Sequence, residues 1–308
     1  MVSTSLASGL KHLTKNRAAL ELILAGALWG FGFIATVWAL GSFTPTETLV
    51  YRFIVASALG EILYLVLRGP RLSTAWADFK RAFPAGALLG GLLLLQTIGL
   101  KYTTATKSGF ITSLYVILVP IINAVIFKTP STAKNYALAI FALFGTFMLM
   151  DGKVDHVNVG DLWTLACAFV ASFHIIYIGK VSSKVGNAFR FNNFQSIWAL
   201  LVLSPLLLTQ DNITVTSSSW MPWLGVLVLG LGSSIIAFSI QIRAQKTLSD
   251  ATASMIFLLE SPFAALFGFL LLSERLNLFQ GFGAVIILLA SVMQILWDPS
   301  SKRTGTTQ

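Results

Sequence analysis

The segment DATASMIFLLESPFAALFGFLLL, residues 250–272, guides the interpretation of the whole chain. It is long enough to cross the ~30 Å hydrocarbon core of a bilayer, which takes roughly 20 apolar residues in a helix. Asp250 opens the segment, and the only other ionisable residue in it is Glu260, close to its middle. We therefore expect a transmembrane helix that carries one carboxyl group near the midplane of the membrane.

The composition extends this expectation to the rest of the chain. Of 308 residues, 56% are hydrophobic and 11% are charged, and the mean hydropathy is +0.79. A soluble domain has about 25% charged residues and needs them to cover its surface. The net charge of +9 is spread over short connectors rather than gathered on one face, which argues against nucleic-acid binding. Soluble, disordered and fibrous proteins are excluded.

Ten apolar runs of suitable length follow one another along the chain. They cover residues 19–40, 45–67, 79–100, 105–127, 133–150, 159–178, 188–208, 220–241, 250–272 and 277–297. We expect an all-α polytopic membrane protein with ten transmembrane helices, five in residues 19–150 and five in residues 159–297. Residues 1–18 and 298–308 are the expected tails. The first run is too long for a signal peptide and lacks a cleavage site, so it is interpreted as a retained helix.

The distribution of lysine and arginine predicts the orientation. Sixteen of the 21 Lys and Arg residues fall in the two tails and the even-numbered connectors, four fall in the odd-numbered connectors, and Arg52 falls within a span. Loops with an excess of positive charge stay in the cytoplasm. We therefore expect both termini on the cytoplasmic side.

The second half of the chain repeats the first at low identity. A shift of 142 residues places Pro120 on Pro262 and Lys101 on Arg243. Apolar sequences align easily, but prolines rarely coincide by chance in the middle of two matching spans. Because each half holds an odd number of spans, the second half must insert upside down, as in many secondary transporters.

Several short motifs also follow a characteristic order. They are Leu28-Trp29-Gly30, Tyr51-Arg52-Phe53, Leu100-Lys101-Tyr102-Thr103-Thr104-Ala105, Leu259-Glu260-Ser261-Pro262 and Ser273-Glu274-Arg275-Leu276. In order and spacing they resemble the two EamA-type repeats of the drug/metabolite transporter superfamily, and the chain is most similar to YddG-like amino-acid exporters. The first repeat departs from the pattern, with Thr132-Ala133 where the second has Glu274-Arg275. The resemblance implies inverted repeats around a central cavity and export of small metabolites, aromatic and other amino acids among them, across a bacterial inner membrane.

The sequence does not predict an enzyme. Its histidines are His12, His156 and His174, its single cysteine is Cys167, and no Asp lies in mid-span. Intramembrane hydrolases and transferases need paired carboxylates, metal ligands or an activated nucleophile. The chain also lacks a Walker A loop, so a pump driven by its own ATP hydrolysis is not expected. We expect neither a cofactor nor a metal.

Three ionisable residues within spans are candidates for function. Glu260 is costly to bury, and such residues mark substrate or proton pathways; alternatively, a protonated Glu260 holds two helices together. Arg52 is interpreted as a snorkelling or paired residue that fixes helix register, with attraction of a substrate carboxylate as the alternative. His174 could take part in proton coupling because imidazole titrates near neutral pH, or it could be a neutral packed residue.

The expected substrate cavity lies between the halves, near the midplane. The residues predicted to line it are Trp29, Phe33, Gln96, Tyr115, Trp163, Gln241 and Glu260. Trp163 begins its span, so it could instead be an interfacial anchor. Pro120 and Pro262 are the predicted hinges, because proline leaves a soft point in a helix.

These features predict a secondary transporter that exports small metabolites, with amino acids as the favoured class, by alternating access. Its partners would be a small-molecule substrate and the lipid bilayer. A multidrug carrier is one alternative. A sugar-phosphate carrier is another, although Arg52 is the only clear cation within a span to offset phosphate charge. A non-transporting scaffold is the alternative from a different class, and it would need no central carboxyl group. Proton coupling and facilitated diffusion both remain possible mechanisms.

Overall fold

The computed structural model describes residues 2–67, 73–103, 105–152, 157–272 and 275–297, with backbone only for residues 2–13, 105, 106 and 272. Within these ranges every regular element is a helix. Nine described helical stretches are long and apolar enough to cross a membrane, and Ala133–Leu149 is a shorter apolar helix of 17 residues, the lower limit for a span. The ten predicted spans are confirmed. The predicted tail 298–308 and the motif residues Ser273 and Glu274 lie outside the described residues.

Six spans are single helices and four are built from shorter pieces. The single helices are α1 (Val2–Leu40), α2 (Pro45–Val66), α3 (Ala75–Tyr102), α6 (Ala133–Leu149), α7 (Val159–Ser182) and α13 (Leu278–Trp297). The composite spans are α4 (Ala105–Ser113) with α5 (Tyr115–Val125), α8 (Ala188–Leu203) with the 3₁₀ helix η1 (Ser204–Thr209), α9 (Met221–Val228) with the π-helix η2 (Leu229–Ala237) and α10 (Phe238–Ala244), and α11 (Asp250–Phe257) with α12 (Glu260–Leu272).

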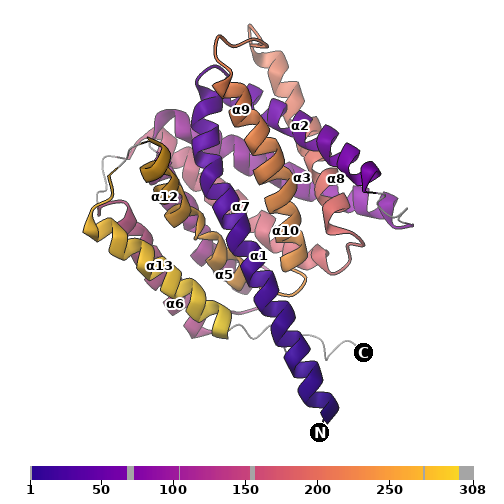
Figure 1. Cartoon of the computed structure of the whole chain (residues 1–308), viewed down its shortest axis with the longest axis vertical. Coiled ribbons are helices and arrows are strands. Elements are labelled where there is room, and N and C mark those ends of the chain that lie inside the picture. The colour runs from indigo at the N-terminus through magenta and orange to yellow at the C-terminus, as the bar shows by residue number, and fades with distance from the viewer. Residues whose placement is uncertain (1, 68–72, 104, 153–156, 273–274, 298–308) are drawn as a thin grey trace.

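The first helix is longer than predicted. It begins at Val2 rather than at residue 19, and its apolar part begins at Thr14. Its N-terminal turns project beyond the other helices (Figure 1). The expected N-tail is therefore a helical extension of the first span.

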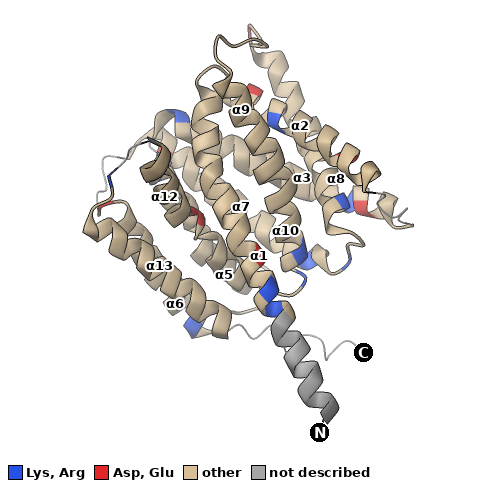
Figure 2. Cartoon of the chain, in the orientation of Figure 1, with Lys and Arg blue, Asp and Glu red and all other residues tan. Residues whose placement is uncertain are grey.

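The surface and the charges agree with a lipid environment. Charged residues lie mainly toward helix ends, and the middle of the bundle is almost free of them (Figure 2). Large apolar side chains such as Leu270, Phe282 and Val292 are exposed. A continuous apolar surface of this kind would be a liability in water, but it is what a bilayer requires.

Capping residues determine where several helices begin. The Thr44 side chain accepts from the Glu47 N–H at 3.2 Å, and the Glu47 carboxylate accepts from the Thr44 N–H at 2.7 Å. Pro45 follows at the first helical position, where its missing N–H costs nothing. Asn158 and Asp161 form the same reciprocal pair at the start of α7. These bonds satisfy backbone N–H groups that a helix leaves unpaired.

The break between α11 and α12 follows from Pro262. Proline has no N–H, so it cannot bond the Leu258 carbonyl four residues earlier. The Ser261 N–H donates to Leu258 O instead, at 3.1 Å. This shorter i to i+3 bond interrupts the helix and makes Glu260 the first residue of α12.

The break in the first half does not lie at the matching proline. Pro120 is inside α5, and the chain is interrupted six residues earlier, at Leu114. The 142-residue shift places Leu114 on Ile256, two residues before Leu258, so both halves break at nearly the same level. The proposed hinge at Pro120 thus has no interruption at its own position, whereas the one at Pro262 does.

The first helix of each half packs mainly on helices of the other half. Helix α1 packs on α9, η2, α10, α11 and α12, and its counterpart α7 packs on α3, α4 and α5. Helix α2 contacts α9 and η2, and α8 contacts α3. Each contact recurs with the halves exchanged, which is the two-fold relation of inverted repeats. The pairs α6–α13 and α2–α8 lie on opposite sides of the bundle (Figure 1).

Helices α6 and α13 cross at two glycines that face each other. A Cβ added at Gly283 would lie 2.5 Å from the Gly145 oxygen and 2.5 Å from the Leu149 nitrogen, and one added at Gly145 would lie 2.9 Å from the Gly283 oxygen. The backbones are therefore in direct contact, as is typical of helices that associate in lipid. A Cβ added at Gly281, in the same helix, would meet no described atom within 4 Å.

Replacement of Gly283 by alanine should destabilise the protein, whereas the same replacement at Gly281 should not. The methyl group at position 283 overlaps the α6 backbone and forces the helices apart, at a cost of about 1–3 kcal/mol. At position 281 it meets open space, and alanine is the better helix former. Thermal unfolding in detergent measures both variants. Equal unfolding midpoints would contradict the close α6–α13 contact.

Candidate functional site

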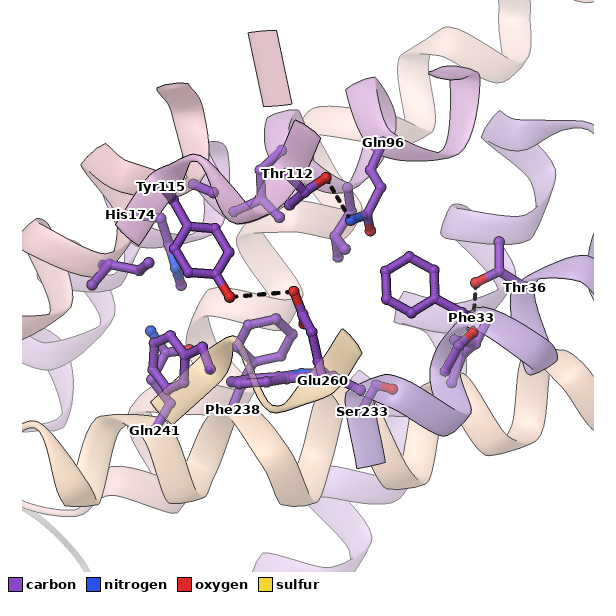
Figure 3. A pocket seen from close by; sticks show the side chains of 18 of the residues that line it. Phe33, Thr36, Gln96, Thr112, Tyr115, His174, Ser233, Phe238, Gln241 and Glu260 are labelled. Atoms are coloured by element: carbon purple, nitrogen blue, oxygen red, sulfur yellow. Dashed lines mark hydrogen bonds between the residues drawn. The ribbon is translucent and has the colours of Figure 1, made fainter. Parts of the chain in front are cut away.

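A cavity of about 100 Å³ lies inside the bundle and is bordered by both halves (Figure 3). Its lining side chains come from α1, α2, α3, α4, α5 and α7, and from η2, α10, α11 and α12. Three of the four composite spans therefore border it. Irregular backbone is tolerated at membrane depth where it lines a cavity, so the fold and the cavity depend on each other.

Most of the predicted site residues meet at this cavity. Those that line it are Trp29, Phe33, Gln96, Tyr115, Gln241 and Glu260, together with His174. Trp163 does not line it. Its side chain is 40% exposed near the start of α7, so the prediction that it forms a cavity wall is wrong, and its position suits an interfacial anchor.

Other lining residues were not predicted, among them Thr112, Phe238 and Phe257. For Thr112 a signal was present, because the 142-residue shift places it on Ser254 and a hydroxyl recurs at that level. The same shift gave a signal for the two phenylalanines. It places the predicted lining residue Tyr115 on Phe257, and it places Gln96 on Phe238.

Three aromatic rings form one wall of the cavity. The Trp29 ring centroid lies 5.2 Å from that of Phe238 and 5.1 Å from that of Phe257, the latter in an edge-to-face arrangement. The Trp29 indole Nε1 is buried and has no hydrogen-bond partner in the described part of the chain. Such a wall packs well against an apolar or aromatic ligand group.

Glu260 faces the cavity and has one hydrogen-bond partner for its side chain among the residues that the structure describes. The Tyr115 hydroxyl donates to Glu260 Oε1 at 3.3 Å (Figure 3), which joins α5 of the first half to α12 of the second. Tyr115 is 4% exposed and Glu260 is 9% exposed. No Lys or Arg in the described part of the chain lies within ion-pair distance of this carboxyl group. It can therefore accept a proton or a cationic ligand group.

Arg52 also borders the cavity, and it is not a snorkelling residue. It is 4% exposed, and its Nε donates to the Ser234 hydroxyl at 2.7 Å. No acidic residue within the described ranges is close enough to pair with it. The prediction that Arg52 snorkels is therefore wrong, and it is instead paired with the Ser234 hydroxyl, a contact that joins α2 to the π-helix. Its position inside α2 could not reveal this, because Ser234 is 182 residues away in sequence.

The π-helix that holds Arg52 is itself braced by α8. A π-turn shifts the backbone ladder and frees carbonyls. Asn192 Nδ2 donates to two of them, Ser234 O at 2.7 Å and Ile235 O at 3.1 Å. Its Oδ1 then accepts from Gln195 Nε2 at 2.7 Å, which leaves Gln195 Oε1 facing His174 Nε2 at 3.4 Å. This network assigns a hydrogen to His174 Nε2, because Gln195 presents an oxygen to it.

Further amide groups line the cavity and lead away from it. Gln96 Nε2 donates to Thr112 Oγ1 at 3.5 Å (Figure 3). Gln241 Nε2 donates to Gln245 Oε1 at 3.0 Å, and Gln245 Nε2 donates to Asp250 Oδ1 at 3.3 Å. A polar path therefore runs from the cavity toward the start of α11. Among the described residues, no three His, Cys, Asp or Glu side chains are placed to hold a metal ion.

Ion pairs join the halves at both ends of the bundle. At one end Lys107 Nζ lies 2.7 Å from Asp161 Oδ2, which ties α4 to α7. At the other end Arg243 Nε lies 2.9 Å from Glu21 Oε2, which ties α10 to α1. The 142-residue shift does not relate the two pairs, since it places Lys101, not Lys107, on Arg243. Each pair holds a basic side chain near the end of its span.

Known proteins match this chain over almost its whole length. The EamA-like transporter family model matches residues 16–151 and 158–296. An uncharacterized transporter of Archaeoglobus fulgidus is 32% identical over 93% of this chain and 87% of its own length. One from Methanothermobacter thermautotrophicus is 25% identical over 91% and 86%, and the uncharacterized transporter YyaM of Bacillus subtilis is 20% identical over 84% and 87%.

A solved crystal structure matches with a TM-score of 0.72 at 18% identity, over 92% of this chain and 96% of that one. At this identity the likeness shows the fold alone. The family match covers both five-helix halves, and the relatives carry the name of transporters rather than enzymes. The chain belongs to the EamA-like transporter family of the drug/metabolite transporter superfamily.

Proposed function

We propose that this transporter exports small metabolites, amino acids and aromatic amino acids among them, by alternating access. The observation that carries the proposal is the cavity between the halves, which combines an aromatic wall with a single buried carboxyl group. An aromatic wall suits a side chain such as that of tryptophan, and the carboxyl group suits an ammonium group.

The broken helices support movement around this cavity. Helix pieces that meet at Leu114 and Leu258 can change their relative angle without unfolding, and Pro262 keeps the second junction from closing into a regular helix. The ion pairs Lys107–Asp161 and Arg243–Glu21 lie at opposite ends of the bundle. In the proposed cycle one end opens while the other stays closed. Pro262 remains the proposed hinge, and Pro120 lies in the rigid piece beside its junction.

Glu260 is the proposed coupling residue. Its carboxyl group can hold either a proton or the ammonium group of the substrate, but not both at once. Exchange of one for the other would couple export to proton entry, and His174 borders the same cavity as a second candidate. Facilitated diffusion without coupling is the alternative.

The competing substrates fit this cavity less well. A sugar phosphate carries about two negative charges, whereas Arg52 is the only Lys or Arg among the described lining residues. A lipophilic drug cation would suit Glu260 and the aromatic wall but leaves Arg52 without a role. The uneven distribution of Lys and Arg supports cytoplasmic termini and a place in the inner, or plasma, membrane.

Uptake into proteoliposomes tests the substrate class. The panel contains labelled tryptophan, threonine, a sugar phosphate and a lipophilic cation, with and without an imposed pH gradient. We expect tryptophan flux that the gradient drives above equilibrium, and no flux of the sugar phosphate. Flux of only the sugar phosphate or the cation would reject the amino-acid proposal. Absence of all flux would favour a non-transporting scaffold.

Substitution Glu260→Gln tests coupling. The amide keeps an acceptor for the Tyr115 hydroxyl but cannot exchange a proton, so gradient-driven accumulation should fall to the equilibrium level. Glu61→Gln is the matched control, because Glu61 pairs with Arg190 in α8 and does not border the cavity. Tryptophan accumulation by Glu260→Gln equal to that of the wild type would make the carboxyl group structural.

A further inference from the structure

The cavity contains two buried, opposite charges that do not neutralise each other. Arg52 and Glu260 both line it, and both are more than nine-tenths buried. Neither forms an ion pair in the part of the chain that the structure describes. Burial of an unpaired charge costs several kcal/mol, and a ligand that pairs with both groups would offset that cost.

The free hydrogen-bonding atoms of both groups are complementary to a zwitterion. The Arg52 guanidinium lies over the Phe53 ring, 5.8 Å from its centroid. Among the described residues it donates a hydrogen bond through Nε alone, so its two terminal nitrogens have no acceptor there. Glu260 uses only Oε1, so Oε2 has no donor there. Guanidinium groups bind carboxylates through two parallel hydrogen bonds, and a carboxylate oxygen accepts readily from an ammonium group.

The surroundings hold Arg52 in a fixed position. Its Nε bonds Ser234 in the π-helix, and Asn192 of α8 holds the carbonyls of that same turn. A guanidinium anchored through Nε presents its remaining N–H groups as a fork. This arrangement resembles a preorganised binding group more than a residue placed only to join helices.

We propose that Arg52 binds the carboxylate of the substrate while Glu260 binds its ammonium group, so that the cavity recognises α-amino acids as zwitterions. This inference rests on the proposed function, since it requires that the cavity carries a small metabolite. The substrate side chain then lies against the wall formed by Trp29, Phe238 and Phe257. Arg52 is the specificity-determining residue for the carboxylate.

Three ligands that each carry an indole ring test the contributions of the two charges separately. Tryptophan carries both, tryptamine lacks the carboxylate, and 3-indolepropionate lacks the ammonium group. Affinities are measured by competition against labelled tryptophan, or by thermal shift where that label binds too weakly, on purified wild type, Arg52→Gln, Arg52→Lys and Glu260→Gln. The ratio of two affinities within one variant does not depend on the folded fraction, so a loss of stability does not obscure the result.

In the wild type we expect tryptophan to bind most tightly. Arg52→Gln should weaken the binding of tryptophan and of 3-indolepropionate by about 10- to 100-fold, which is the usual effect of losing a hydrogen bond to a charged group. The affinity for tryptamine should stay within about threefold of that of the wild type. Glu260→Gln should weaken the binding of tryptophan and tryptamine but not that of 3-indolepropionate. Arg52→Lys should restore part of the carboxylate affinity, because it keeps the charge and loses the fork.

The control variant is Arg190→Gln, which removes an arginine that lies outside the cavity and pairs with Glu61. It should preserve all three affinities. If Arg52→Gln shows the same ratio of tryptophan affinity to tryptamine affinity as the wild type, the inference is overturned. The proposed function would be left intact. Binding of none of the three compounds by the wild type would reject the amino-acid proposal and this inference with it.

Discussion

Inside a bilayer every backbone N–H and C=O group must find its partner within the protein, because lipid offers none. Most spans meet this constraint as unbroken helices, and the exceptions are therefore informative. At Leu258 the Ser261 N–H replaces the bond that Pro262 removes, and in the π-helix the Asn192 side chain bonds the freed carbonyls. These interrupted spans border the same cavity. The departures from regular helix therefore lie where a ligand would bind.

The inverted repeat explains why this cavity is central. Helix α1 packs on the second half and α7 on the first, so the space between them belongs to both halves. The contact between Gly145 and Gly283 holds α6 and α13 close together at one side of the bundle. The junctions at Leu114 and Leu258 lie at nearly the same level. A rigid periphery around two soft junctions is the architecture on which alternating access depends.

The ten spans and several of the cavity residues are predictable from the sequence because both leave strong local signals. Apolar runs of bilayer length are unmistakable, and Glu260 is conspicuous in such a run. Other features depend on distant contacts: the role of Arg52 is defined by Ser234 and the absence of a nearby acid, and no local pattern marks the π-helix. Trp163 misled because an aromatic residue at a span end fits an interface as well as a cavity. Pro120 was misleading because α5 continues through it and the interruption lies at Leu114 instead.

Two-sided access to the cavity is the most direct test of the central claim. A single cysteine is introduced by Ser233→Cys in a Cys167→Ala background, with Ser291→Cys as control, since Ser291 is buried against Met255 and away from the cavity. A membrane-impermeant thiol reagent is applied from either side of oriented vesicles. The account predicts that Ser233→Cys reacts from both sides and is protected by transported substrate, while Ser291→Cys reacts from neither. Reaction from one side only, or no reaction at all, would contradict alternating access.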